Sequence, residues 1–512
     1  MNSMLYKAGG LRASPSLMAL SEWQEKEKQA LNCAVDEEGC LLDNLTLELR
    51  VHPPEIHVDN VGDSSSTIVT IDSANRPGSL VFVVQHFTEL GLRINRARIS
   101  SDGGWFHDMF QVSEVNGAKV KNPKKIQSIK QMLNVYMQTE DVVANGDTTD
   151  DANRVETTVF EASGVDRSGL LADLMQLMTQ NGCDVRSAAV WTYRQRVAFV
   201  FSVTEKGRPI ADEAKTRRLN EMMSEIIASS KGSHTVRSIK LRGVVHHDRR
   251  LHQLMLEDDI SDWRSKHEAE ITDTGAGGSL SSPFESGSEK SVVEASFRSP
   301  KYDKPIIDIS HFSHSNYWTV NIKCRDRTKL LLDTVCTLAD MNYDIYHATI
   351  DADDEGYANQ EYFIRPRTGE GEFNPREARL VKAMLEASIE RRFPKGMKVH
   401  VRSIDRFGCM AALTRQLHDA GLSVTRAKVR TYATSNSSGH TLYVMNAKGG
   451  PPDREQLQNA LLQCGGKAVD IHEISDGRTP LVDSHRFSFT FLQRGKPNTS
   501  WGGSPESMGF SL

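Results

Sequence analysis

A short junction, Asp-Arg-x-Gly directly before an apolar run, recurs along the chain and constrains its fold more than any other feature. It reads GVDRSGLLADLMQ from Gly164, CRDRTKLLLDTVC from Cys324 and SIDRFGCMAALTR from Ser403, with a looser copy, SANRPGSLVFVVQ, from Ser73. One copy would be compatible with a simple turn. Four copies indicate a repeated structural module.

The spacing after each junction is the same in all four copies. The junctions are aligned on one residue each, here called the junction residue: Asn75, Asp166, Asp326 and Asp405. Sixteen positions later stands a residue that tolerates the left-handed backbone at a helix end, namely Gly91, Gly182, Asn342 and Gly421. The pattern therefore predicts a first helix of equal length in every copy.

Each first helix is followed by segments typical of two strands and a second helix. The first of these segments alternates β-branched with other residues from nineteen positions after the junction residue, as in INRARI from Ile94 and VTRAKV from Val424. With an apolar segment before each junction, the unit reads β-α-β-β-α and lacks one strand of a closed antiparallel sheet. We therefore expect an α+β fold of four ferredoxin-like βαββαβ modules.

Counting strands suggests how the modules pair. Between modules 1 and 2, and between modules 3 and 4, there is sequence for only one strand, although two are needed. An apolar segment upstream of each pair, PEIHVDN from Pro54 and IIDISH from Ile306, is expected to supply a leading strand. On this count, module 1 pairs with module 2 and module 3 with module 4.

The repeat and the composition of the segments between its copies predict the domain organisation. Flexible ends and a helix with a Gly/Ser-rich linker separate and flank the modules. The expected segments are a flexible extension at 1–45, module 1 with its leading strand at 46–142, module 2 at 155–243, helix and linker at 244–304, module 3 with its leading strand at 305–396, module 4 at 397–475 and a flexible tail at 476–512.

Charge, hydropathy and cysteine usage exclude several classes of partner and site. With 62 Lys plus Arg against 67 Asp plus Glu, the chain has no field that favours nucleic acid, and no apolar run is long enough to cross a membrane. The seven cysteines show no CxxC spacing, so no metal site and no disulfide framework is expected. A reducing compartment follows, and we expect cytoplasm or nucleus rather than plastid.

The junction itself has two interpretations. The acidic residue stands where a helix N-cap is expected, so its carboxylate would accept hydrogen bonds from the first free N–H groups of the helix. Alternatively, a Gly three positions later leaves those N–H groups open to the carboxylate of a free amino acid, and the acidic side chain accepts the ammonium group. The candidate ligand residues are Asn75, Gly78, Asp166, Arg167, Gly169, Asp326, Asp405, Arg406 and Gly408.

The four copies are not equally suited to a ligand. Modules 2 and 4 keep Asp, Arg and Gly, whereas module 1 has Asn75 in place of the acid. Module 3 has Lys329 in place of the Gly, where the side chain would fill the space that a ligand needs. We therefore rank modules 2 and 4 above module 1, and module 3 last.

These motifs resemble ACT domains, and more narrowly the plant ACT domain repeat proteins, which carry four such modules and no enzyme domain. The phrases that carry the resemblance include LELRVHPPEIHVDN, ISSDGGWFHDMFQV, CRDRTKLLLDTVCTLADMNYDIYHATI and GLSVTRAKV, and it runs from about residue 46 to about residue 475. The resemblance implies free amino acids bound between paired modules and a regulatory, sensing role without a cofactor. The chain departs from it at NRPGSLV and FGCMAAL.

Enzymatic interpretations find little support, and an interaction protein is the alternative to a sensor. DADD at 351–354 is interpreted as a solvated loop, and VHHDRRLH from Val245 as a short exposed helix without further metal ligands. No catalytic residue is therefore expected. In the alternative, the junctions are helix caps and the sheets bind a regulated protein partner or a second copy through their edges.

Overall fold

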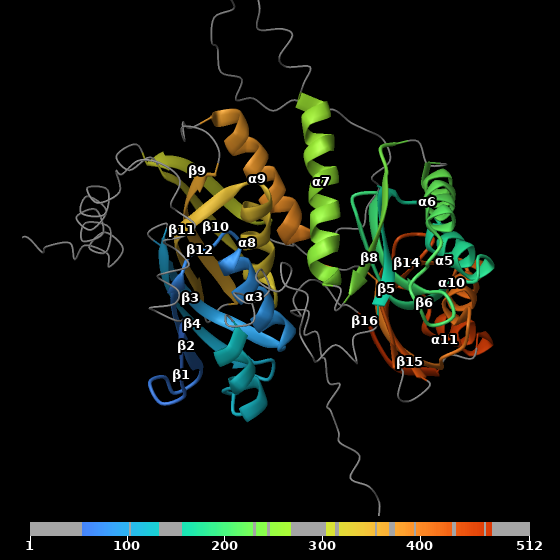
Figure 1. Cartoon of the computed structure of the whole chain (residues 1–512), viewed down its shortest axis with the longest axis horizontal. Helices are drawn as coiled ribbons and strands as arrows, with labels where there is room; N and C mark the ends of the chain where they lie inside the picture. Colours follow the sequence, from blue (N-terminus) through green and yellow to red (C-terminus); the bar gives the residue numbers. More distant parts are fainter. Residues whose placement is uncertain are drawn as a thin grey trace, which may run out of the picture.

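The structure is a computed structural model, and its strands form two eight-stranded antiparallel sheets. It describes residues 54–101, 104–132, 156–228, 232–242, 246–267, 304–312, 317–353, 356–367, 374–393, 396–432, 437–464 and 467–473. The strand orders are β1-β2-β4-β3-β11-β12-β10-β9 in sheet A and β16-β13-β15-β14-β6-β7-β5-β8 in sheet B (Figure 1). The expected flexible segments 1–45 and 476–512, and the Gly/Ser-rich stretch, lie outside the described residues.

Each sheet is built from two modules. In sheet A, module 1 comprises β1 (Glu55–Asp59), β2 (Thr67–Ala74), α3 (Ser79–Glu89), β3 (Leu92–Ser100), β4 (Trp105–Glu114) and a helix at 123–132. Module 3 comprises β9 (Ile306–Phe312), β10 (Tyr317–Arg325), α8 (Leu330–Asp340), β11 (Tyr343–Ala352), β12 (Tyr357–Pro366) and α9 (Pro375–Glu390).

Sheet B holds the other two modules. Module 2 comprises β5 (Glu156–Val165), α5 (Leu170–Gln180), β6 (Asp184–Tyr193), β7 (Arg196–Thr204), α6 (Glu213–Ala228) and β8 (Thr235–Arg242). Module 4 comprises β13 (Met397–Ile404), α10 (Cys409–Asp419), β14 (Leu422–Tyr432), β15 (Ser437–Asn446), α11 (Arg454–Gln463) and β16 (Lys467–Glu473). All four modules are ferredoxin-like, which confirms the predicted fold class.

The repeat appears in the structure with the predicted spacing. Each first helix has 11 residues and begins four positions after its junction residue. The residue sixteen positions after the junction residue has a positive φ in every module, with Asn342 at 63° where the others have Gly. A β-bulge in the next strand also recurs at the same place, as between Ile94 and Arg96. Equal spacing in sequence therefore corresponds to equal backbone geometry.

The predicted leading strands are present, but the predicted pairing of modules is wrong. β1 pairs with β2 and β9 with β10, so each leading strand occupies the place that β8 and β16 occupy in modules 2 and 4. However, β3 pairs with β11 and β14 with β6, which joins module 1 to module 3 and module 2 to module 4. In both pairs the contact is made by the same strand of each module, as in an isologous interface, and the paired modules are not neighbours in the chain.

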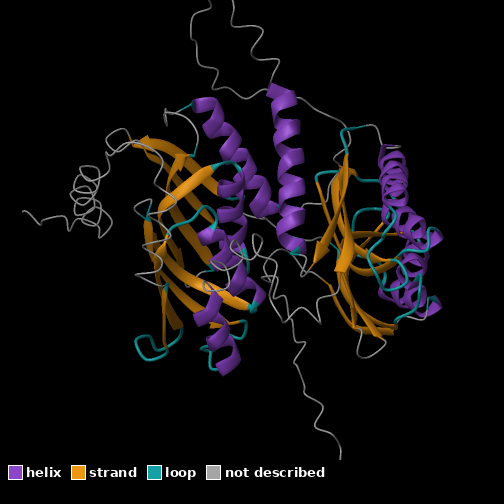
Figure 2. Cartoon of the chain, viewed as in Figure 1, coloured by secondary structure: helices purple, strands orange, loops and turns teal. Residues whose placement is uncertain are grey.

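The sheets and helices stack as layers, and α7 (His247–His267) lies between the helices that cover sheet A and the open face of sheet B (Figure 2). The remaining helices of modules 1 and 3 cover one face of sheet A, and those of modules 2 and 4 cover one face of sheet B. On the opposite face of sheet B, α7 buries Leu251, Leu254 and Met255 against β5, β6 and β7. On its other side, Leu256 of α7 packs against α9. The short exposed helix expected here is therefore a buried helix of 21 residues.

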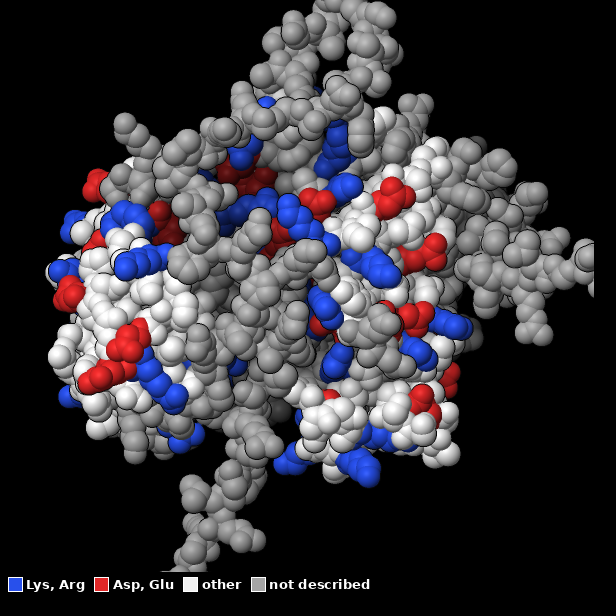
Figure 3. All heavy atoms as spheres, turned by 180° about the vertical axis from the view of Figure 1, so that it is seen from behind, with Lys and Arg blue, Asp and Glu red and all other residues white. Residues whose placement is uncertain are grey.

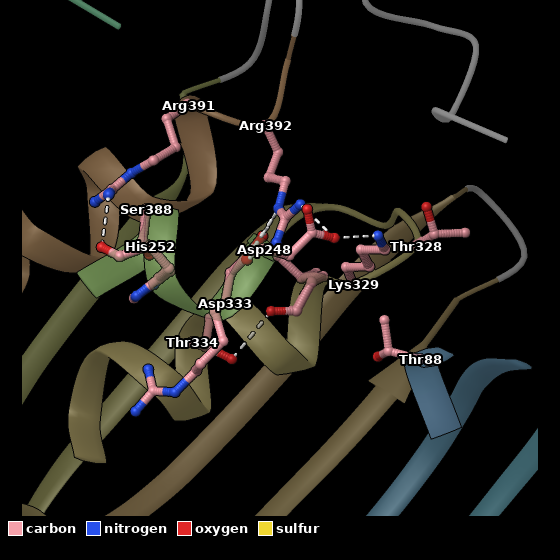
Figure 4. A network of polar contacts seen from close by, with 12 residues as sticks. Thr88, Asp248, His252, Thr328, Lys329, Asp333, Thr334, Ser388, Arg391 and Arg392 are labelled. Atoms are coloured by element: carbon pink, nitrogen blue, oxygen red, sulfur yellow. Dashed lines mark hydrogen bonds and ion pairs between the residues drawn. The ribbon is translucent and has the colours of Figure 1, made fainter. Parts of the chain in front are cut away.

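Buried ion pairs connect α7 to module 3 (Figure 4). Asp248 at the start of α7 accepts a hydrogen bond from Lys329 at 2.6 Å and lies 3.7 Å from Arg392. Asp333 of α8 is bound by both Arg392 and Arg327 at 2.8 Å. Burial alone would raise the pKa of Asp333, but the charges of Arg392 and Arg327 lower it to about 2. Two arginines therefore depend on one buried carboxylate.

Asp333→Asn is predicted to destabilise the chain by about 3 kcal/mol or more, because it removes the acid that pairs with buried Arg327 and leaves buried Arg392 only the more distant Asp248. The matched control is Asp351→Asn, whose side chain is 56% exposed and 3.3 Å from Arg96, and it should cost less than about 1 kcal/mol. Urea unfolding at pH 7 measures both variants. Equal effects for the two would contradict the account of this network.

Candidate functional site

The residue three positions after the junction residue is the N-cap of the first helix in every module. Gly78, Gly169, Lys329 and Gly408 are the N-caps, all with left-handed backbones and none with a side-chain cap hydrogen bond. The junction acids therefore do not cap the helices, and the interpretation of Asp166 as an N-cap is wrong. Positive φ explains the recurring Gly, because a Cβ at this angle is strained.

The junction glycines also allow two modules to approach closely. A Cβ added to Gly169 would lie 2.9 Å from Cε1 of His418 at the end of α10. A Cβ added to Gly408 would lie 3.0 Å from Cγ2 of Thr179 at the end of α5. Each junction in sheet B thus contacts the last turn of the first helix of the other module. This arrangement depends on the pairing of module 2 with module 4.

A cleft opens at the junction of module 2, between that module and module 4, and is called here the 2–4 cleft. Its empty space, open mouth included, is about 470 Å³. Module 2 contributes the junction, the first turn of α5 and an apolar wall, and module 4 contributes the end of α10 and the start of β14. The lining residues are Asp166, Arg167, Ser168, Gly169, Leu170, Leu171, Ala172, Val190, Val197, Phe199, Thr414, His418, Leu422, Ser423 and Val424.

Asp166 is the charged group whose environment is most unusual in the 2–4 cleft. Burial raises the pKa of its carboxyl group to about 6, although the backbone N–H and the charge of Arg167 act in the opposite direction. Arg167 itself is drawn away, because its guanidinium group pairs with Asp173 of α5 at 2.8 Å. The half-buried Asp166 thus faces the cleft without a cation from module 4 among the described residues.

The other two junction acids meet an arginine from the paired module. Asp326 is bound by Arg93 of β3, and Asp405 lies 3.6 Å from Arg186 of β6. The residue of module 4 that corresponds to Arg93, eighteen positions after the junction residue, is Ser423. A short neutral side chain therefore stands beside the Asp166 junction where modules 1 and 2 supply a cation. The cation of a ligand can therefore lie beside Asp166, at the place where a guanidinium group lies beside the other two junction acids.

A second cleft lies at the junction of module 3, between that module and module 1, and is called the 1–3 cleft. Its empty space, mouth included, is about 420 Å³. Its lining residues are Thr88, Leu92, Arg93, Ile94, Asn95, Asp326, Arg327, Thr328, Lys329, Leu330, Leu331, Leu332, Ile350, Ala352, Ala358 and Gln360. Arg327, like Arg167, folds back onto its own helix, where it pairs with Asp333.

The structure distributes the predicted ligand residues unevenly. Asp166, Arg167 and Gly169 line the 2–4 cleft, and Asp326 lines the 1–3 cleft. The remaining candidates line neither cleft. Asn75 donates to Ser101 Oγ at 2.8 Å, while Arg406 is exposed. Gly78 and Gly408 remain as N-caps, and Asp405 as the partner of Arg186.

Sequence reasoning missed the residues that the paired modules contribute, such as His418, Ser423, Arg93 and Gln360. They stand at fixed distances from their own junctions, so the repeat contained their positions. Finding them required the correct pairing of modules, and the expected pairing in sequence order pointed to other strands.

The described residues also bear on the excluded chemistry. Among them no group of three or more His, Cys, Asp or Glu side chains is arranged to hold a metal ion. Cys183, Cys324 and Cys336 are buried, and burial raises the pKa of each thiol. No described helix is long and apolar enough to cross a membrane. On the face in Figure 3, acidic and basic side chains lie interspersed.

Comparison with known proteins identifies the family. A model of the ACR family N-terminal ACT domain matches residues 62–140. ACT domain-containing protein ACR8 of Arabidopsis thaliana is 32% identical over 436 residues, which are 84% of this chain and 88% of that protein. ACT domain-containing protein ACR3 of the same plant is 34% identical over 426 residues, covering 80% and 85%. This chain is a member of the ACR family.

A match outside the ACR family covers only part of this ACR protein. A bifunctional uridylyltransferase/uridylyl-removing enzyme of Rhodospirillum rubrum is 33% identical over 81 residues, which are 16% of this chain and only 9% of the enzyme. The names of the ACR relatives describe ACT domains and no catalytic domain. Membership therefore supports a regulatory, amino-acid-sensing class of function in general.

Asp166→Asn is predicted to stabilise this ACR protein above pH 6. The folded pKa of about 6 exceeds the ordinary 3.8, so protonated Asp166 favours folding below about pH 4 and this contribution disappears as the pH rises through 6. The loss is at most about 3 kcal/mol. The difference in unfolding free energy between wild type and variant should therefore grow from pH 4 to 6 and stay constant above.

Asp108→Asn provides the comparison. Burial raises the pKa of Asp108 to about 8, so its difference from wild type should keep growing to about pH 8. Urea unfolding at half-unit pH intervals measures both curves. Stability of the Asp166 variant that follows wild type at every pH would show that this carboxyl group is not in a low-dielectric environment.

Proposed function

We propose that this ACR protein is a non-catalytic regulatory sensor that binds a free amino acid in the 2–4 cleft. The ammonium group of the ligand pairs with Asp166, and its carboxylate lies at the N-terminus of α5. Family membership supports the amino-acid-sensing class, and the geometry of the cleft supports this particular site. In sheet B the 2–4 cleft combines a buried acid, an exposed helix start and an apolar wall.

The observation that carries the proposal is the carboxylate of Asp166, which is half-buried and faces no cation from the described part of module 4. Ionising such a group costs free energy, as its raised pKa shows. An ammonium ion placed beside it recovers part of that free energy upon binding. At the module 3 junction Arg93 binds the corresponding acid, Asp326, and at the module 4 junction Arg186 lies 3.6 Å from Asp405, which lines neither cleft.

The α-carboxylate of the ligand is assigned to the first turn of α5. The first N–H groups of an α-helix have no carbonyl partners within the helix and attract anions. Leu171 and Ala172, which belong to this turn, line the cleft, and no N-cap side chain covers it. Asp166 and the start of α5 are neighbours in the junction, so together they can bind the ammonium group and the carboxylate of one amino acid.

The wall of the cleft indicates the side chain that the ligand carries. Val190, Val197 and Phe199 are each no more than 1% exposed and line the cleft. These side chains have almost no contact with water themselves, so the gain comes from the hydrocarbon surface of the ligand, worth about 25 cal/mol per Å² buried. We therefore propose an apolar amino acid as the ligand.

A thermal-shift panel with the twenty amino acids tests the proposal on the full chain. A ligand that binds only the folded state stabilises it by about 2.7 kcal/mol at a hundredfold excess over its dissociation constant. We expect a rise in melting temperature with one or a few apolar amino acids at pH 7.5. The rise should shrink as the pH falls below about 6, because protonated Asp166 no longer attracts the ammonium group.

Two variants remove the site and one serves as a control. Asp166→Asn removes the counter-charge, and Ser423→Arg supplies the guanidinium group that Arg93 provides at this position of module 1, so both should lose the shift. Asp405→Asn changes the same position of the repeat outside the two clefts and should keep it. No shift with any amino acid would instead favour an interaction protein whose sheets bind a protein partner or a second copy.

A further inference from the structure

The two clefts are equivalent in position but differ in one lining side chain, which comes from β7 in one cleft and from β12 in the other and is called here the floor residue. In β7, Phe199 lies four residues before Val203, which pairs with Val185 at the bulge of β6. In β12, Gln360 lies four residues before Ile364, which pairs with Ile345 at the bulge of β11. Phe199 and Gln360 thus occupy the same place, and both line their clefts. One floor is apolar and the other carries an amide.

Gln360 is a buried polar side chain that is only half satisfied. It is 3% exposed, and its Oε1 accepts a hydrogen bond from the hydroxyl of Tyr362 at 2.7 Å. Its Nε2 has no hydrogen-bond partner within the described part of the chain. Leaving a buried N–H group unpaired costs about 1–3 kcal/mol. The floor of the 1–3 cleft therefore presents donors that require an acceptor.

The other side of the cleft shows the same excess of donors. Arg93 bonds Asp326 through its terminal nitrogen, but its Nε is buried and has no partner among the residues described. Leu331 and Leu332, in the first turn of α8, also line the cleft, so helix N–H groups are near. Meanwhile Asp326, the group that would accept an ammonium ion, is neutralised by Arg93. The 1–3 cleft thus has free donors and an occupied acceptor.

We infer that the 1–3 cleft binds a small carboxylate without an ammonium group, such as a 2-oxo acid. The carboxylate and the adjacent carbonyl oxygen accept hydrogen bonds from Gln360 Nε2, Arg93 Nε and the start of α8. An amino acid binds less well here, because its ammonium group would have to displace the guanidinium group from Asp326. The inference rests on the proposed function only for treating the clefts as equivalent ligand sites.

The two clefts would then give one chain two complementary specificities. In the 2–4 cleft, Asp166 has no arginine partner from module 4 among the described residues and the floor residue is apolar, so this cleft selects ligands with an ammonium group. In the 1–3 cleft, Asp326 is paired with Arg93 and the floor residue is an amide, so this cleft selects ligands without an ammonium group. An amino acid and the 2-oxo acid with the same side chain differ only at that group, so the pair of clefts is suited to sensing both members of a transamination couple.

Calorimetric titration of the full chain at pH 7.5 tests this with matched ligands. The probes are pyruvate against alanine, 2-oxoglutarate against glutamate, and 2-oxoisovalerate against valine. At least one oxo acid should bind with one site per chain. Gln360→Leu, which removes the amide, and Gln360→Glu, which keeps its shape and the acceptor for Tyr362, should each weaken that binding at least about tenfold.

A gain of binding provides a readout that does not depend on substituting a core residue. Arg93→Ala removes a partly exposed side chain and frees Asp326, so the 1–3 cleft should now favour the amino acid of the matched pair at least about tenfold. Asp166→Asn, which affects only the 2–4 cleft, should leave oxo-acid binding unchanged. That variant separates failure of this inference from failure of the proposed amino-acid site.

Three results would overturn the inference. They are absence of oxo-acid binding to wild type at about 10 mM, a dissociation constant for the oxo acid that is the same in the Gln360 variants, and an Arg93→Ala variant without any change in preference. Any of these would leave Gln360 as a polar core residue whose amide binds an internal water molecule.

Discussion

Edge-to-edge pairing of alternate modules is the constraint on which the rest of the structure depends. Both pairings use the same register, since His347 opposes Ser100 and Arg426 opposes Trp191, which in each case joins positions 21 and 25 after the two junction residues. This register sets the first helices of the paired modules side by side. The junctions of sheet B therefore meet the last turn of the first helix of the paired module, and the clefts lie where paired modules meet.

Charge distinguishes junctions whose backbones are alike. Module 1 supplies Arg93 to Asp326, module 2 supplies Arg186 to Asp405, and the described residues of module 4 supply no cation to Asp166. The cation comes from the position eighteen residues after the junction residue in module 1, Arg93, and from two positions further on in module 2, Arg186, whereas module 4 has Ser423 and Thr425 at these positions. By contrast, the ion pairs of α7 are complete within the chain. Asp248 pairs with Lys329 of module 3 and Asp258 with Arg196 of module 2, so α7 connects the two sheets.

Local geometry was predictable from the sequence, and contacts between distant segments were not. Glycine spacing predicted the length of the first helices, and strand counting located the leading strands, because both depend on neighbouring residues. The pairing was missed because β3 and β14 show no local sign of which edge they join. The left-handed backbone of Gly169, with a φ of 81°, was also not visible in the sequence. β7 was recognised as a strand, but its apolar run on both faces was not connected with α7, which covers it.

Disulfide trapping in the full chain tests the pairing most directly. Ser187 opposes Arg430 across β6 and β14, so the double variant Ser187→Cys with Arg430→Cys should form an intramolecular disulfide under mild oxidation. If modules 1 and 2 paired with the same register, Ser187 would instead oppose Ser100. The account predicts efficient cross-linking of the first pair and none for Ser187→Cys with Ser100→Cys. The opposite result would contradict the pairing and, with it, both clefts.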